Sequence, residues 1–262
     1  MVRGAEAAVQ RTVPAERRLP VRADCPRPIV IASYARPRGC PNLTPLLALL
    51  LERYRVPVLV HGPAAGRGRR GGAASWQVLR ELGILPARSL ACASARMAAD
   101  RLAYVETSLL APALGGGAVT AATRMAAALL DPFGGAGVRV LGATDARMLA
   151  ALRAHLEATA ADALLLRATG GEPFADPRRP PRIEWYRQGV ATVMFAARPP
   201  EQSPERLPAP GDAAAIADWT AGALAGRVAI PGAILDELAC CVHAAGSDGA
   251  AAEPVGAARR YG

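Results

Sequence analysis

Lysine is missing from this chain, because all 31 of its basic residues are arginine. The absence excludes enzymes that need a lysine, such as Walker-type nucleotide hydrolases, Schiff-base enzymes and protein kinases. With 22 acidic residues, the arginines leave a formal net charge of +9. Two interpretations of that charge stay open: an electrostatic footprint for nucleic acid or another polyanion, or a nucleotide bias in the gene.

Cysteine and long apolar runs are also scarce. The five cysteines form no C-x-x-C pair and have no histidine at metal-ligand spacing, which predicts free thiols and no zinc site. No apolar run approaches the ~20 residues that span a bilayer, and the first residues lack the apolar segment of a secretory signal. We therefore expect a cytoplasmic protein without a membrane partner. A length of 262 residues with 52% hydrophobic content allows one sizeable core.

Short apolar runs alternate with helical patterns through most of the chain. This alternation predicts an α/β domain with a mainly parallel sheet flanked by helices. Gln188-Gly189 lies between two further runs, 182–186 and 190–195, and predicts an antiparallel hairpin at the sheet edge. Two helices, roughly 212–225 and 231–245, follow a proline-rich linker. The five strands expected before the hairpin are 29–31, 56–60, 102–105, 138–141 and 163–167.

The composition divides the chain into three expected segments. Residues 1–28 are rich in proline and arginine and predict a flexible arm. Residues 29–246 form the α/β domain with its carboxyl-terminal helices. Residues 247–262 predict a disordered tail.

Two loops follow the first two predicted strands, at 33–39 and 61–72. In open α/β sheets, ligands bind beyond the carboxyl ends of the strands, so we expect both loops to line one crevice. Thr44 is predicted to cap the helix that begins at Pro45, and Ser75 to cap the next helix. Both loops carry arginine.

Several segments, read in order, resemble one family: IVIASY, PNLTPLLALLL, VPVLVHGP and GEPFADPRR. They are similar to the YbiB-type DNA-binding proteins, relatives of anthranilate phosphoribosyltransferase in the nucleoside phosphorylase-like class (glycosyl transferase family 3). The resemblance covers about residues 27–246 and implies a homodimer that binds DNA along basic grooves in place of the enzyme reaction. Family members carry a helical domain before the first strand. Only 28 residues precede Ile29, so we expect that domain to be missing.

The first loop departs from the enzyme. A phosphoribosyltransferase holds a pyrophosphate with glycine-exposed amides, hydroxyls, a basic group and Mg²⁺. The Gly-Thr-Gly-Gly-Asp loop of the enzyme aligns with residues 32–36, where the glycines are lost. We expect the side chains of Ser33, Tyr34 and Arg36, with Arg38, to contact a phosphate backbone instead. The alternative is an arginine-bearing surface loop without a ligand.

The second loop also lacks residues that the enzyme uses to bind pyrophosphate. His61-Gly62 matches a His-Gly pair of the enzyme, but Val60 stands where the enzyme has a lysine. Beyond the pair, a hydroxyl-rich segment is replaced by glycines and arginines, which neutralise phosphates without reading bases. The alternative is a solvated loop without a ligand. The arginines concerned are Arg67, Arg69 and Arg70.

A single carboxylate remains of the pair that holds magnesium in the enzyme. That pair falls at Gly171-Glu172, so Glu172 is expected to be at most a weak Mg²⁺ ligand. Downstream, Arg178 and Arg179 are expected to add phosphate contacts. The preferred hypothesis is a non-catalytic protein that binds DNA without sequence preference and needs no cofactor. The alternatives are an active, Mg²⁺-dependent transferase using phosphoribosyl diphosphate and a small aromatic or nucleobase acceptor, or a remnant with neither activity.

Overall fold

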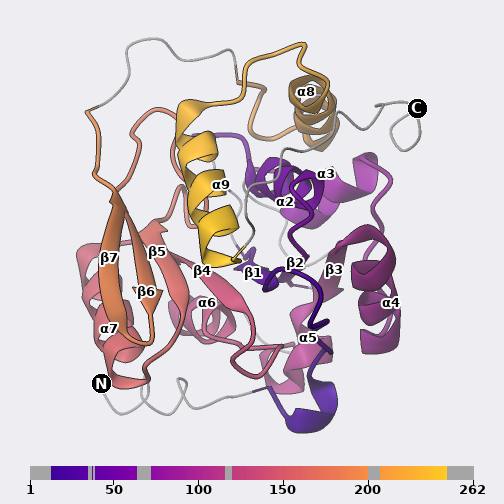
Figure 1. Cartoon of the computed structure of the whole chain (residues 1–262). Coiled ribbons are helices and arrows are strands. Elements are labelled where there is room, and N and C mark those ends of the chain that lie inside the picture. Colours follow the sequence, from indigo (N-terminus) through magenta and orange to yellow (C-terminus); the bar gives the residue numbers. More distant parts are fainter. Residues whose placement is uncertain are drawn as a thin grey trace.

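The computed structural model describes residues 13–34, 37, 39–63, 72–115, 120–199 and 207–246. They contain one seven-stranded sheet in the order β3-β2-β1-β4-β5-β6-β7, with helices on both faces (Figure 1). The predicted fold class, a mainly parallel α/β sheet flanked by helices, is confirmed.

Five parallel strands form most of the sheet, and an antiparallel hairpin completes one edge. The hairpin turns at Gln188 and Gly189, whose φ angles are 51° and 78°. Positive φ at both central residues matches the right-handed twist of the flanking strands, so the prediction from this dipeptide is confirmed. The strands are β1 Ile29–Ala32, β2 Val58–Gly62, β3 Leu102–Glu106, β4 Val138–Ala143, β5 Ala163–Arg167, β6 Ile183–Arg187 and β7 Val190–Phe195.

The helices follow the expected pattern, with three short additions. The long ones are α2 Thr44–Arg53, α3 Ser75–Glu81, α4 Leu90–Asp100, α6 Ala121–Ala128, α7 Ala146–Ala158, α8 Ala213–Leu224 and α9 Gly232–Ala244. The additions are η1 Ala15–Arg17, α5 Thr107–Leu110 and η2 Pro112–Leu114. A single turn is too short to show helical periodicity, which is why the sequence pattern missed them. Among the described helices, none is long and apolar enough to cross a membrane.

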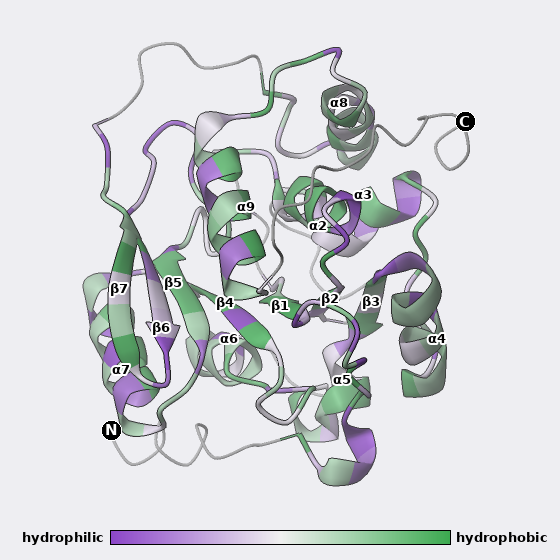
Figure 2. Cartoon of the chain, viewed as in Figure 1, coloured by the Kyte–Doolittle hydropathy of each residue, from purple (hydrophilic) through white to green (hydrophobic). Residues whose placement is uncertain are grey.

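Alternate strand residues supply the cores on the two faces of the sheet. Ile29 and Ile31 of β1 point to the face covered by α2, α3, α8 and α9, whereas Val30 points to the face that carries α4 and α5. Residues 44–51 of α2 are all buried, because this helix lies between the sheet and its neighbouring helices. Figure 2 shows the apolar character of α2 and α8 on this side.

Residues 13–28, part of the expected flexible arm, contact the core and other parts of the chain. Val13 and Leu19 are buried in the core that also holds Val30, and the Leu19 amide donates to the Pro132 carbonyl at 2.8 Å. Arg27 forms an ion pair with Asp162 at 2.7 Å. Two isolated apolar residues of this stretch thus fill part of that core despite the polar composition around them. Residues 1–12 and the predicted tail, 247–262, lie outside the described residues.

Candidate functional site

The two predicted loops begin side by side at the carboxyl edge of the sheet. The Ser33 amide donates to the His61 carbonyl at 2.8 Å, which continues the parallel pairing of β1 and β2. Gly62 permits this approach, because a Cβ there would overlap the Ser33 carbonyl oxygen and lie 2.6 Å from the Tyr104 hydroxyl. Further along, Gly72 lies against the Pro37 carbonyl. The described ends of both loops therefore adjoin one another.

A buried polar network ties these loop ends to Glu172. The Ser33 and Thr44 hydroxyls donate to Glu172 Oε2 at 2.5 Å and 3.2 Å. Ser33 Oγ also lies 2.7 Å from Ser75 Oγ. A hydroxyl has one proton, so Ser75 donates to Ser33 while Ser33 donates to the carboxylate. Glu172 is fully buried, and the network joins β1, α2, α3 and the segment after β5 around it.

Asn42, two residues before α2, completes this network. Its Oδ1 accepts from the Thr44 amide at 3.1 Å, and its Nδ2 donates to Ser75 Oγ at 3.0 Å. Thr44 and Ser75 are therefore not the caps that the sequence predicted. Each is the first residue of its helix, and its hydroxyl points into the network instead; α3 is capped by Gln77, whose side chain accepts from the Ala74 amide.

His61 is held neutral beside the network. The Thr107 hydroxyl donates to the Gly62 carbonyl at 3.1 Å, so His61 Nδ1 is the donor in its 2.9 Å contact with Thr107 Oγ1. The Nε2 atom then carries a lone pair, and no hydrogen-bond partner for it exists among the described residues. Burial lowers the pKa of His61 to about 4. The imidazole can therefore accept a hydrogen bond but does not supply positive charge near neutral pH.

Tyr34 lies between His61 and a crevice at the carboxyl ends of β1 and β4, where the order of the strands in the sheet reverses. Its ring meets His61 edge to face, with 6.4 Å between centroids, and burial raises its hydroxyl pKa to about 12. On its other side, a crevice of about 20 Å³ lies between the ends of β1 and β4. Arg124 of α6 also lines this crevice. Arg124 is not among the residues predicted from the sequence, because nothing local marks a helical arginine as facing a distant end of the sheet.

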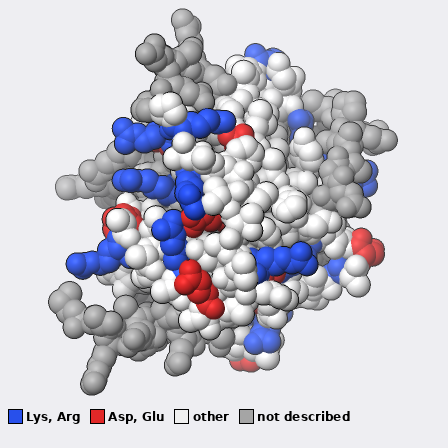
Figure 3. All heavy atoms as spheres, turned by 60° about the vertical axis from the view of Figure 1, so that its left-hand side comes forward, with Lys and Arg blue, Asp and Glu red and all other residues white. Residues whose placement is uncertain are grey.

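The predicted arginines are only partly placed. Arg178 and Arg179 are exposed, and Arg178 Nη1 donates to the Gly39 carbonyl at 2.8 Å, which brings this side chain to the first loop. Figure 3 shows basic side chains gathered on the side of β6, β7 and α7. On β6, Glu184 is flanked by Arg153 and Arg182 at 2.8 Å and 2.6 Å. The remaining predicted contacts lie outside the described residues: Arg36, Arg38, Arg67, Arg69 and Arg70.

The similarity of this chain to known proteins agrees with its architecture. No protein-family model matches the chain. Uncharacterized protein YbiB of Escherichia coli (strain K12) is 29% identical over 229 residues, which cover 84% of this chain and 70% of YbiB. Anthranilate phosphoribosyltransferase (TrpD) of Thermus thermophilus superposes with a TM-score of 0.61 at 20% identity, over 95% of this chain and 74% of the enzyme.

The chain has the fold of anthranilate phosphoribosyltransferase. The enzyme of Saccharomyces cerevisiae, solved in complex with PRPP and Mg, superposes with a TM-score of 0.53 at 10% identity, over 93% of this chain and 78% of the enzyme. At these identities the likeness extends to the fold, and the residues of the site have to be judged on their own chemistry.

The groups around Glu172 fit Mg²⁺ poorly. Mg²⁺ usually keeps several waters and takes one or two carboxylates together with substrate phosphates. Glu172 is fully buried, and Ser33 and Thr44 already direct their hydroxyl protons at one of its oxygens. Within the described ranges, no group of three or more His, Cys, Asp or Glu side chains could hold a metal ion. In this arrangement Glu172 connects the loops, and we assign it no step in a metal-dependent reaction.

Proposed function

We propose that this chain is a non-catalytic member of the anthranilate phosphoribosyltransferase fold that binds DNA through its arginine-bearing loops. The observation that carries the proposal is the closed network at Glu172. One carboxylate oxygen of Glu172, Oε2, accepts hydrogen bonds from both Ser33 and Thr44. Buried hydrogen bonds thus hold the carboxyl ends of these strands together, and the sequences of both loops carry arginine.

Charge and placement support DNA as the partner. The described ends of the two loops adjoin one another, and the sequence between those ends carries Arg36 and Arg38 in the first loop and Arg67, Arg69 and Arg70 in the second. Arg178 contacts the first loop from the side. A guanidinium is always charged and binds phosphate in a planar fork, and contacts to phosphate carry no sequence information. Binding should therefore tolerate any sequence and weaken with salt.

The transferase reaction should be absent. The lost glycine loop, Val60 in place of a lysine and the single carboxylate remove three separate parts of the machinery. We expect purified protein with Mg²⁺, phosphoribosyl diphosphate and anthranilate to show no turnover above a protein-free control, followed by anthranilate fluorescence. Glu172→Gln retains an oxygen that can accept from Ser33 and is the matched variant. Turnover by the parent that this variant abolishes would establish the transferase and end the non-catalytic proposal.

DNA binding should follow the salt dependence of a few phosphate contacts. Contacts to about four phosphates imply a log-log slope near −3.6, hence a loss of roughly 100-fold between about 50 and 200 mM salt. Replacing Arg67, Arg69 and Arg70 by glutamine should flatten the slope by up to about three units for every sequence tested. Fluorescence-anisotropy titrations of two unrelated duplexes at several salt concentrations measure both quantities.

A matched triple variant at the opposite end of the strands from the loops controls for the total charge that is removed. Arg55, Arg101 and Arg187 lie next to the amino ends of β2 and β3 and at the end of β6, away from the loops. Their replacement by glutamine removes the same charge and should leave the slope within about one unit of the parent. Equal slopes for the parent and the loop variant would place the contacts elsewhere. No binding by the parent at low salt would end the nucleic-acid proposal.

A further inference from the structure

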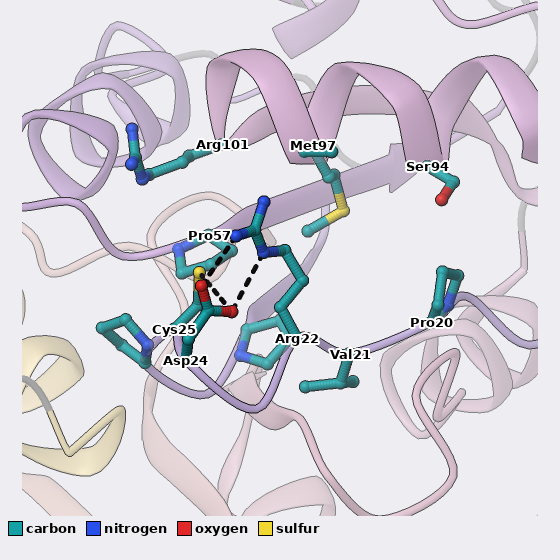
Figure 4. Close-up of a pocket in the computed structure, with 12 residues that line it drawn as sticks. Pro20, Val21, Arg22, Asp24, Cys25, Pro57, Ser94, Met97 and Arg101 are labelled. Carbon is teal, nitrogen blue, oxygen red and sulfur yellow. Dashed lines mark hydrogen bonds and ion pairs between the residues drawn. The ribbon is translucent and has the colours of Figure 1, made fainter.

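A second cavity lies at the amino ends of the parallel strands, whereas the loops follow their carboxyl ends. It has a volume of about 200 Å³ and opens between the segment 20–28 and α4, below the amino ends of the first strands (Figure 4). Pro28 and Pro57 precede β1 and β2, and Arg101 precedes β3. Because these positions begin strands rather than end them, the cavity is separated from the network at Glu172 by the length of the sheet.

The wall formed by residues 20–28 is anchored at both ends. On one side, the buried Leu19 donates to the Pro132 carbonyl at 2.8 Å. On the other, Arg27 donates from its amide to the Ala245 carbonyl at 2.9 Å and forms its ion pair with Asp162. The cavity is therefore built into the fold before any ligand arrives, which lowers the entropic cost of binding.

The lining is mostly aliphatic. From α4, Ser94, Met97, Ala98 and Arg101 face the cavity at the spacing of one helix face. Across from them lie Val21 and four prolines. Figure 4 shows the Met97 side chain directed toward the opposite wall. An apolar cavity of ~150 Å³ holds a benzene-sized molecule, so this one has room for an aliphatic body of about six carbons.

One positive charge in the lining lacks a counter-charge among the residues that the structure describes. Arg22 pairs with Asp24 through two contacts, at 3.1 Å and 2.7 Å, and this pairing lowers the pKa of Asp24. These two charges cancel. Arg101 ends α4, with a φ of 57°, and its guanidinium has no hydrogen bond or ion pair to any described residue. The cavity thus carries a net charge of +1, from a side chain suited to bidentate recognition of carboxylate.

We propose that this cavity binds a small aliphatic monocarboxylate, with its carboxylate on the Arg101 guanidinium and its apolar body against Met97 and the prolines. One unpaired guanidinium matches one negative charge. A dianionic phosphate would leave a charge unmatched beside Asp24, which disfavours it. An aliphatic body suits a lining without aromatic rings. The site is independent of the proposed DNA contacts.

Hexanoate is a suitable probe, with hexanol as its uncharged analogue. Titrating hexanoate into the parent, followed by amide NMR shifts, should give saturable changes confined to residues 20–28 and 94–101. Hexanol should bind at least about tenfold more weakly, since it lacks the charge-assisted contacts. Hexanoate that causes no saturable shifts, or hexanol that binds equally well, would overturn the proposal.

Two variants and a control locate the contacts. Arg101→Gln should weaken hexanoate about tenfold or more while leaving the weak binding of hexanol unchanged. Ala98→Phe should fill the cavity and abolish the binding of both probes. Arg88→Gln, an exposed arginine before α4 that does not line the cavity, is the matched control and should bind hexanoate like the parent. Parent-like affinity in Arg101→Gln would remove the assigned carboxylate contact and with it the proposal.

Discussion

Replacing Glu237 by glutamine should stabilise the folded protein at about pH 8 by several kcal/mol and have little effect at about pH 5. Glu237 lies on α9 and is fully buried. Its Oε2 accepts from the Ala175 amide at 2.7 Å, while Oε1 has no hydrogen-bond partner among the described groups. Burial in this apolar layer raises the pKa of Glu237 to about 8.

The direction in which stability changes with pH follows from the number of protons that Glu237 binds in the folded and unfolded states. An unfolded glutamate has a pKa of about 4.3, so between that pH and about 8 the unfolded state holds fewer protons than the folded state. Stability conferred by the neutral carboxyl is therefore complete below the unfolded pKa and is lost as the pH rises toward 8. The total loss is on the order of 4 kcal/mol. Glutamine does not ionise, so the variant loses this dependence.

Urea unfolding at several pH values, followed by circular dichroism, measures the difference between parent and variant. The difference cancels the opposite contribution of His61, whose lowered pKa makes stability fall as the pH drops from about 6.5 toward 4. Glu157→Gln, at an exposed position on α7, is the matched control and should show no such trend. A difference between Glu237→Gln and the parent that stays constant with pH would mean that Glu237 is ionised in the folded state.

Replacing Gly62 by alanine should destabilise the protein by on the order of 3 kcal/mol. The added Cβ would overlap the Ser33 carbonyl oxygen and approach the Tyr104 hydroxyl at 2.6 Å. The Ser33 carbonyl belongs to the backbone and cannot rotate away, so β1 and β2 would have to separate where the two loops begin. The cost arises from overpacking in a close-packed interior.

Gly39→Ala is the matched control for this prediction. A Cβ at Gly39 meets nothing within 4 Å, so this change should shift stability by less than about 0.5 kcal/mol. The midpoints of urea unfolding of the two variants and the parent, compared at one pH, measure this difference in stability. Equal midpoints for Gly62→Ala and Gly39→Ala would show that the strands relax around the methyl group.

Local sequence patterns determined the framework of this protein. The apolar runs located the strands to within a few residues, Pro45 marked the start of α2, and Gln188-Gly189 specified the hairpin turn. Each of these signals depends on backbone preferences and on burial within a few neighbouring residues, so a single sequence is enough to read them. The two loops at the carboxyl edge also followed, since parallel strands end at the same side of a sheet.

Tertiary structure alone decided what the polar residues of the site do. Ser33 and Glu172 are 139 residues apart and meet only because β1 and the segment after β5 converge. Thr44 and Ser75 look like helix caps in sequence, yet the fold offers their hydroxyls buried partners, and a buried polar group gains more from a partner than an exposed one. Likewise, Arg101 faces a cavity only because residues 20–28 cross in front of α4. Hydrogen-bond partners and cavities depend on the path of the whole chain, which no local pattern encodes.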